Sequence, residues 1–173
     1  MDKRRVFALL LAAVVVGCSA EPADDDAYDH VMSFDTARVR IISKQDTLPL
    51  LVELARSAEQ RSMGLMERRR LADNAGMLFI YDSTQPPTAG FWMYRTRIPL
   101  DIAFLDSVGG IGAIRSMVPC PTDIADGCPT YTPDVPYRYA LEVNAGSFTR
   151  RGIGVGDNVI LQDVPPPLRR ETR

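Results

Sequence analysis

The feature that most constrains the fold of this chain is the shortness of its apolar segments. Runs of alternating or continuous apolar residues recur along the sequence, and glycine, proline or aspartate soon follows most of them. Such runs favour short strands, and no long βαβ unit is visible in the sequence. The sequence therefore predicts an α+β fold with a mostly antiparallel, barrel-like sheet and two short helices inserted. The predicted strands cover residues 37–44, 48–54, 76–81, 100–106, 111–118, 137–143 and 158–162.

The first predicted helix is marked by its N-terminal cap. Ser57 followed three residues later by Gln60 is a capping-box pattern, so a helix should begin there and run to about Glu67. Gly64 lies inside this helix at a cost of about 1 kcal/mol relative to alanine. We take this cost to indicate that another backbone approaches Gly64 closely. A second, shorter helix is expected to end at Gly152.

Residues 1–17 are predicted to be a lipoprotein signal peptide. A basic head precedes an apolar stretch that is too short to span a bilayer. The stretch ends in Val15-Val16-Gly17-Cys18, which resembles a bacterial lipobox. In lipoproteins of that type, cleavage precedes the cysteine, and the cysteine then carries the lipid. The alternative is an ordinary signal peptide with an incidental cysteine.

A lipidated Cys18 would anchor the protein to a bacterial membrane, facing the periplasm or the cell surface. Residues 18–36 begin with an acidic run and hold few core-forming residues, so they are expected to form a solvated tether. A single domain should occupy residues 37–164, followed by a loose tail over residues 165–173. The formal net charge of −2 argues against binding to nucleic acid.

Cys120 and Cys128 are expected to form a structural disulfide, because they follow an export signal and Cys18 would carry lipid. The only histidine is His30, which lies in the expected tether. The sequence therefore predicts no metal site and no cofactor, and it excludes a histidine-dependent nucleophile within the domain. A calcium site built from carboxylates alone is the remaining alternative. Its ligands would be Asp123, Asp126 and Asp134.

Residues 91–101 hold the only tryptophan of the chain together with other aromatic, cationic and acidic side chains. Pro99 cannot donate a hydrogen bond to a sheet, so a strand over these residues should break there. The side chains around the break should then be exposed. An aromatic face beside arginine donors suits a sugar, a carboxylate or a peptide terminus. The alternative is that these residues form the edge of an ordinary core. The predicted binding surface consists of Arg61, Trp92, Arg95, Thr96 and Asp101.

Asp101 and Glu142 form a candidate carboxylate pair. If their strands are neighbours, the two groups could perform acid/base chemistry while Arg61 or Arg95 orients a substrate carboxylate. The alternative is that Asp101 holds the turn at Pro99 and pairs with Arg61.

Five separated motifs carry a family resemblance. They are RSMGLM at residues 61–66, GMLF at 76–79, FWM at 91–93, IPLD at 98–101 and LEVNAG at 141–146. In this order they resemble the DUF192 family, also called UPF0127, over about residues 39–161. The resemblance implies a protein that is exported or lipid-anchored, and it implies no particular chemistry. The family usually has Lys-Asn-Thr where this chain has Tyr94-Arg95-Thr96, so a ligand bound by that asparagine would be held differently here.

Two functions remain open on the sequence. The first is a non-catalytic envelope module that binds a glycan, a peptide or a partner protein through the face of Trp92. The second is a cofactor-independent hydrolase or lyase that acts on cell-wall material through Asp101 and Glu142. An exposed Trp92 beside a shallow groove would favour the first function, whereas a deep pocket in which two carboxylates converge within about 5–10 Å would favour the second.

Overall fold

The computed structural model describes residues 32–122, 124–161 and 163–165. The predicted signal peptide, Cys18, His30 and Asp123 lie outside these residues. The two hydrophobic clusters of the domain draw only on residues 34–164. The described elements are β1 (Asp35–Ile42), β2 (Thr47–Ala55), α1 (Ala58–Met63), β3 (Ala75–Gln85), β4 (Phe91–Trp92), β5 (Leu100–Leu105), β6 (Ile111–Met117), η1 (Ala125–Gly127), β7 (Thr130–Tyr131), β8 (Tyr137–Asn144), η2 (Thr149–Arg151) and β9 (Asn158–Ile160).

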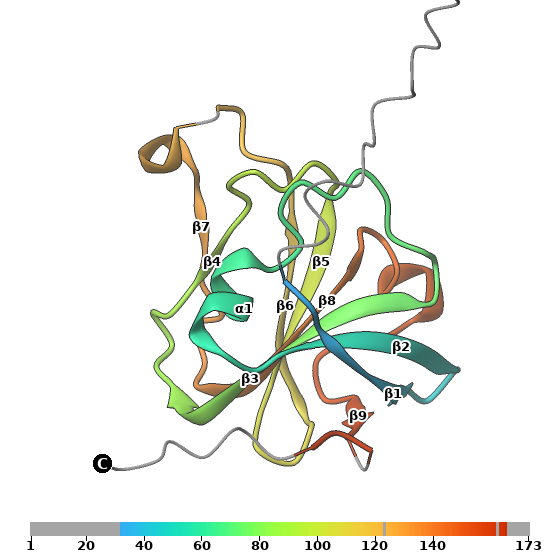
Figure 1. The fold of residues 1–173 in the computed structure, drawn as a ribbon. Helices are drawn as coiled ribbons and strands as arrows, with labels where there is room; N and C mark the ends of the chain where they lie inside the picture. The colour runs from blue at the N-terminus through green and yellow to red at the C-terminus, as the bar shows by residue number, and fades with distance from the viewer. Residues whose placement is uncertain (1–31, 123, 162, 166–173) are drawn as a thin grey trace, which may run out of the picture. The chain divides into compact units, whose positions relative to one another are not determined.

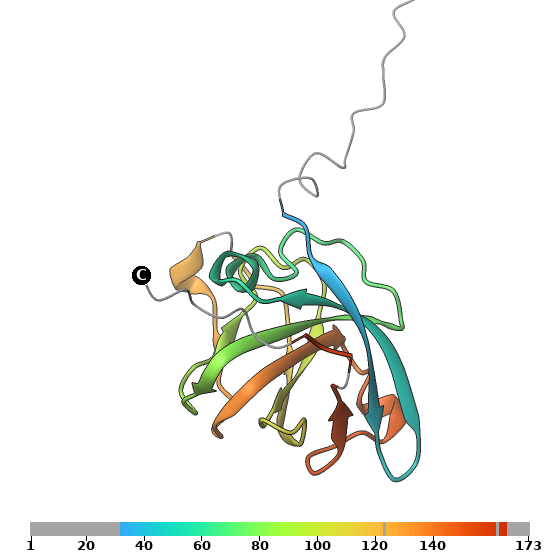
Figure 2. The ribbon, with the colours of Figure 1, turned by 60° about the horizontal axis from the view of Figure 1, so that its bottom comes forward.

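Seven of these strands form one sheet in the order β6-β5-β8-β3-β2-β1-β9. β2 and β3 run parallel, and the other neighbouring strands pair antiparallel. The sheet curls into a half-barrel, as Figures 1 and 2 show. At one end of the curl, Gly110 in the β5–β6 turn forms a bridge with Asn158 of β9, so the two edges of the sheet meet there. The remaining strands, β4 and β7, form a small separate sheet.

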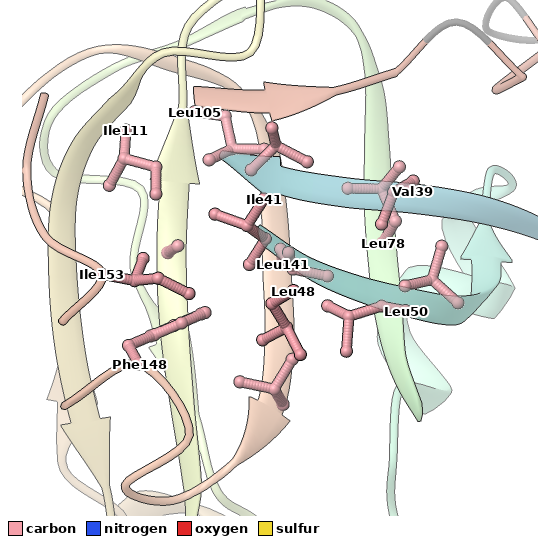
Figure 3. Packing of buried hydrophobic residues seen from close by; sticks show 14 of the residues in the cluster. Val39, Ile41, Leu48, Leu50, Leu78, Leu105, Ile111, Leu141, Phe148 and Ile153 are labelled. Atoms are coloured by element: carbon pink, nitrogen blue, oxygen red, sulfur yellow. The ribbon is translucent and has the colours of Figure 1, made fainter. Parts of the chain in front are cut away.

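Alternate side chains of the strands fill the inside of the curl. β1 contributes Val39 and Ile41, and β2 contributes Leu48 and Leu50. Residues two apart in a strand point to the same face, so a slip of one residue would expose this whole set. Phe148, which follows β8, packs into the same cluster (Figure 3). This inner cluster therefore fixes the register of the β1–β2 pair.

The central strands are also buried on their outer face. Every residue of β5 is buried, and residues 76–80 of β3 are buried as well. An outer layer, made of α1 with the residues that follow it and of the β4–β7 sheet, covers this face. Within it, the ring of Phe91 packs against Phe79 and Phe104, with centroid distances of 4.9 and 5.7 Å. The outer layer thus completes a second hydrophobic cluster.

The fold is mostly β and not α+β, because only one short α-helix forms among the described residues. This helix begins at the predicted capping box of Ser57, and it ends at Met63 because Gly64 takes a φ of 51°. The second predicted helix is a single 3₁₀ turn, Thr149–Arg151, which Gly152 ends in the left-handed conformation. The prediction of two short helices was therefore wrong.

The predicted strands are present, with differences at their ends. β3 continues to Gln85, four residues beyond the end of the strand predicted over residues 76–81. β1 begins at Asp35, inside the expected tether. β5 begins at Leu100, directly after Pro99, as predicted.

The disulfide predicted between Cys120 and Cys128 is present. Closing so short a loop stabilises the folded state by about 2–3 kcal/mol. Among the described residues, no helix has the length and apolar composition needed to cross a bilayer.

We expect Gly64→Ala to lower the free energy of unfolding by about 1–3 kcal/mol, because alanine is strained at a φ of 51°. A Cβ atom at this position would lie 3.4 Å from the Phe79 ring. The nearest neighbour is thus a side chain, and the expectation of a close backbone was wrong. Gly154→Ala is the matched control, since a Cβ there would meet nothing within 4 Å. Equal loss of stability in the two variants under chemical denaturation would contradict this explanation.

Candidate functional site

Trp92 lies on the outward side of the outer layer. β4 pairs with β7, and the alternation of side chains along β4 directs Phe91 towards the sheet and Trp92 away from it. The indole is 47% exposed. The ring of Tyr94 lies 5.5 Å from it, tilted by 39°. Trp92 is therefore not buried in the core, and its ring is open to solvent.

Two arginines that follow these aromatic residues in the sequence are held by one carboxylate. Arg95 donates from Nε to Glu67 Oε1 at 2.6 Å, and Arg97 donates from Nε to Glu67 Oε2 at 2.9 Å. The N–H of Glu67 also donates to the carbonyl of Arg95 at 2.7 Å. Hydrogen bonds from Arg97 and then from Arg95 hold the pKa of the Glu67 carboxyl below its usual value. We call Trp92, Tyr94, Arg95 and Arg97 the Trp92 surface.

The disulfide loop is tied to the same region. The N–H of Cys120 donates to the carbonyl of Met93 at 3.4 Å, and the N–H of Val118 donates to Tyr131 Oη at 3.2 Å. Met93 itself is buried. The backbone that carries Trp92 is therefore fixed from β7, from the disulfide loop and from the core below it.

The other members of the predicted binding surface do not share this exposed face. Arg61 donates from Nη1 to the carbonyl of Ile80 at 3.0 Å, and its guanidinium lies 4.9 Å from the centre of the Tyr81 ring. Its role is to attach α1 to β3. Thr96 is only 7% exposed, and Asp101 only 2%. The prediction that all five residues lie together on one surface was wrong.

The candidate carboxylate pair is not formed. Asp101 stands opposite Val143 in the β5–β8 pairing, whereas Glu142 stands opposite Ile102. Adjacent residues of a strand point to opposite faces, so Asp101 and Glu142 lie on opposite faces of the sheet. Asp101 accepts a hydrogen bond from Ser116 Oγ at 2.7 Å. The alternative in which Asp101 pairs with Arg61 is also wrong, since each has another partner.

Glu142 is buried in the outer cluster, with 4% of its surface exposed. Its neighbours across the strands are the apolar side chains of Ile102 on β5 and Met77 on β3. Among the described residues, no donor forms a hydrogen bond with its carboxyl group. Burial alone raises the pKa of Glu142 to about 8.

Across the outer face of the sheet, Glu142 lies in a row of paired residues that ends in Arg115 on β6 and Glu53 on β2. Both end residues bind other partners. Arg115 follows Ile102 in the row and binds Asp134 at 2.8 Å. Glu53 follows Met77 and forms a two-bond ion pair with Arg68, with both distances 2.6 Å. Arg115, the cation at one end of the row, and Arg68, which binds Glu53 at the other end, are thus both paired with carboxylates other than Glu142.

The predicted calcium alternative loses one of its ligands to an ion pair, because Asp134 binds Arg115. The described part of the chain contains no group of three or more histidine, cysteine, aspartate or glutamate residues arranged to hold a metal ion.

Sequence reasoning missed Glu67, Tyr94 and Arg97. Tyr94 and Arg97 flank predicted residues, so the local cluster of aromatic and basic side chains could have included them. Glu67 lies 28 residues before Arg95. No local pattern connects residues so far apart, because their contact depends on how the outer layer folds.

We expect the free energy of unfolding to fall as the pH rises from 4.5 to about 8, because of the buried carboxyl of Glu142. An unfolded chain loses this proton near pH 4.5, whereas the folded protein keeps it to about pH 8. The bound proton therefore makes its whole contribution to the free energy of unfolding below pH 4.5. Above that pH the contribution declines by up to about 1.4 kcal/mol per pH unit, until Glu142 also ionises in the folded protein. Glu142→Gln should remove this decline. Denaturation midpoints measured from pH 5 to 8 test it, with Glu53→Gln as control; an unchanged slope in Glu142→Gln would contradict the assignment.

Of the comparisons with known proteins, one matches a family model and another finds similar solved structures. The family model of DUF192, described as an uncharacterized ACR, matches residues 40–161. No curated protein matches the chain. The chain is similar to a crystal structure from Sinorhizobium meliloti 1021 named a "putative transcription regulator", with 38% identity and a TM-score of 0.67 over 74% of this chain and 95% of that one. It is also similar to a protein of unknown function from Novosphingobium aromaticivorans DSM 12444, with 31% identity and a TM-score of 0.63 over 75% of this chain and 88% of that one.

Proposed function

The chain belongs to the DUF192 family, and we propose that it is a lipid-anchored envelope protein whose Trp92 surface binds a ligand without catalysis. The family resemblance noted in the sequence is thereby confirmed. The observation that carries the proposal is the half-exposed indole of Trp92, whose neighbour on β4, Phe91, packs its ring into the core.

The chemistry of the Trp92 surface suits a glycan best. Indole and phenol faces can stack on the apolar face of a sugar ring, and arginine donates to hydroxyl or carboxylate oxygens in a fixed geometry. Because Glu67 holds both arginines, little side-chain freedom has to be lost when a ligand binds. A peptide or a partner protein is the second class of ligand that such a surface can take.

The second candidate function, a hydrolase or lyase using Asp101 and Glu142, has weaker support. Carboxyl groups on opposite faces of a sheet cannot act on the two sides of one bond. A role in transcription, which the name of the Sinorhizobium meliloti structure attaches to that protein, gains no support from the net charge of −2 in this chain.

We expect Trp92→Ala to weaken binding to a cell-wall glycan roughly tenfold, because a stacked indole at the centre of a binding surface carries much of the affinity. Co-sedimentation with insoluble peptidoglycan measures the effect. Val108→Ala is the control, since Val108 is an exposed apolar residue in the β5–β6 turn, away from the Trp92 surface. Equal sedimentation of Trp92→Ala and the unchanged protein would contradict a role for the indole.

We expect Cys18→Ser to release the protein from membranes, because the apolar segment before it is too short to span a bilayer. Fractionation of cells that export the protein tests the anchor. If the serine variant still sediments with membranes, the lipid anchor is excluded.

A further inference from the structure

The outer layer leaves one part of the sheet uncovered. It covers β3, β8, β5 and the end of β2 at Ala55, whereas the outer face of β1 and of the first part of β2 is exposed, with Leu51 on β2 48% exposed. Figures 1 and 2 show β1 and β2 on the other side of the domain from β4 and β7. A hollow of about 440 Å³ lies on this bare face. Its lining includes Arg38, Arg40, Pro49, Leu51, Ile160 and Asp163.

Strand register places the charged and the apolar residues of this hollow side by side. Arg38 stands opposite Leu51, and Arg40 stands between Pro49 on β2 and Ile160 on β9. Residues two apart on β1 share a face, so both guanidinium groups project from the outer face of the sheet. The hollow therefore combines apolar side chains of β2 and β9 with two cations on β1, the strand between them.

Neither arginine of the hollow is neutralised by the described part of the chain. Arg38 and Arg40 form no hydrogen bond and no ion pair there, whereas Arg56, Arg68 and Arg115 on or near the same sheet each bind a carboxylate. Asp163 is the single acid in the lining, so the hollow keeps an excess of positive charge. Two like charges so close together repel each other, and an anion between them would relieve that repulsion.

The apolar and the basic residues of the lining together indicate one class of ligand. A small inorganic anion would leave Pro49, Leu51 and Ile160 exposed to water, and an uncharged apolar molecule would leave both arginines without a partner. The volume falls in the range of small-molecule pockets. We propose that this hollow binds a monomeric amphiphile, a single acyl chain whose carboxylate or phosphate head is held by Arg38 and Arg40. The chain of the ligand lies along Leu51 and Pro49. This site is separate from the Trp92 surface and does not depend on it.

Isothermal titration calorimetry with dodecanoate and dodecyl phosphate, below their micelle concentrations, tests the proposal. Residues 32–173 are suitable for it, because both hydrophobic clusters are contained within them. The joint variant Arg38→Gln and Arg40→Gln should weaken binding at least about tenfold, since each lost contact is a charge-assisted hydrogen bond. Leu51→Asn should weaken the binding of dodecanoate more than the binding of octanoate, because it removes apolar contact with the acyl chain of the ligand. Both substitutions lie on an exposed face, and thermal unfolding checks that the variants fold.

The joint variant Arg69→Gln and Arg70→Gln is the matched control, because it removes the same charge from exposed positions outside the hollow. It should bind dodecanoate within about twofold of the unchanged protein. Acetate and dodecanol should each bind at least about tenfold more weakly than dodecanoate. Absence of dodecanoate binding, or an equal loss in the two arginine variants, would overturn the proposal. Binding to vesicles of phosphatidylglycerol without binding of the monomeric amphiphiles would overturn it as well, since the site would then recognise a bilayer surface.

Discussion

Burial of both faces of the central strands is the constraint on which the rest of this structure depends. The curl of the sheet buries the inner face, but the outer face of β5, β8 and β3 is also largely buried. A second layer is therefore needed, and little regular structure is available to build it. One short helix and two strands of two residues each supply it. Aromatic packing and a disulfide hold that layer in place, where in many domains a long helix would do so.

The position of Trp92 follows from this layer. Because Phe91 must face the sheet to pack between Phe79 and Phe104, the next residue of β4 must face outward. Buried Met93 then returns the chain to the core. The packing that completes the second cluster thus also presents the indole to solvent. The same layer closes over Glu142 and keeps its carboxyl away from water.

The sequence was most informative where the signal is local. The apolar runs predicted the strands, and the capping box predicted the start of α1. The expected export signal led to the predicted pairing of Cys120 with Cys128. The end of α1 was misjudged because a glycine inside a helical pattern was read as tolerated, whereas Gly64 takes a positive φ and stops the helix. The resulting fold class had too much helix.

The candidate site was harder to predict because it depends on register and on distant contacts. Asp101 and Glu142 do lie on neighbouring strands, but one residue of register decides that they face opposite sides. Arg61 was assigned to the surface, yet backbone carbonyls and the Tyr81 ring hold it. The hollow on β1 and β2 was missed for a similar reason. Its two arginines alternate with apolar residues like those of any exposed strand face, and only the uncovered neighbours make the hollow.

The central claim is that the outer layer packs onto the sheet while leaving Trp92 in solvent. Because Trp92 is the only tryptophan of the chain, its fluorescence in the native protein tests this claim directly. The structure predicts an emission maximum close to that of the unfolded chain and efficient quenching by acrylamide. Emission shifted strongly to the blue, with little quenching until the protein unfolds, would show a buried indole and contradict the account.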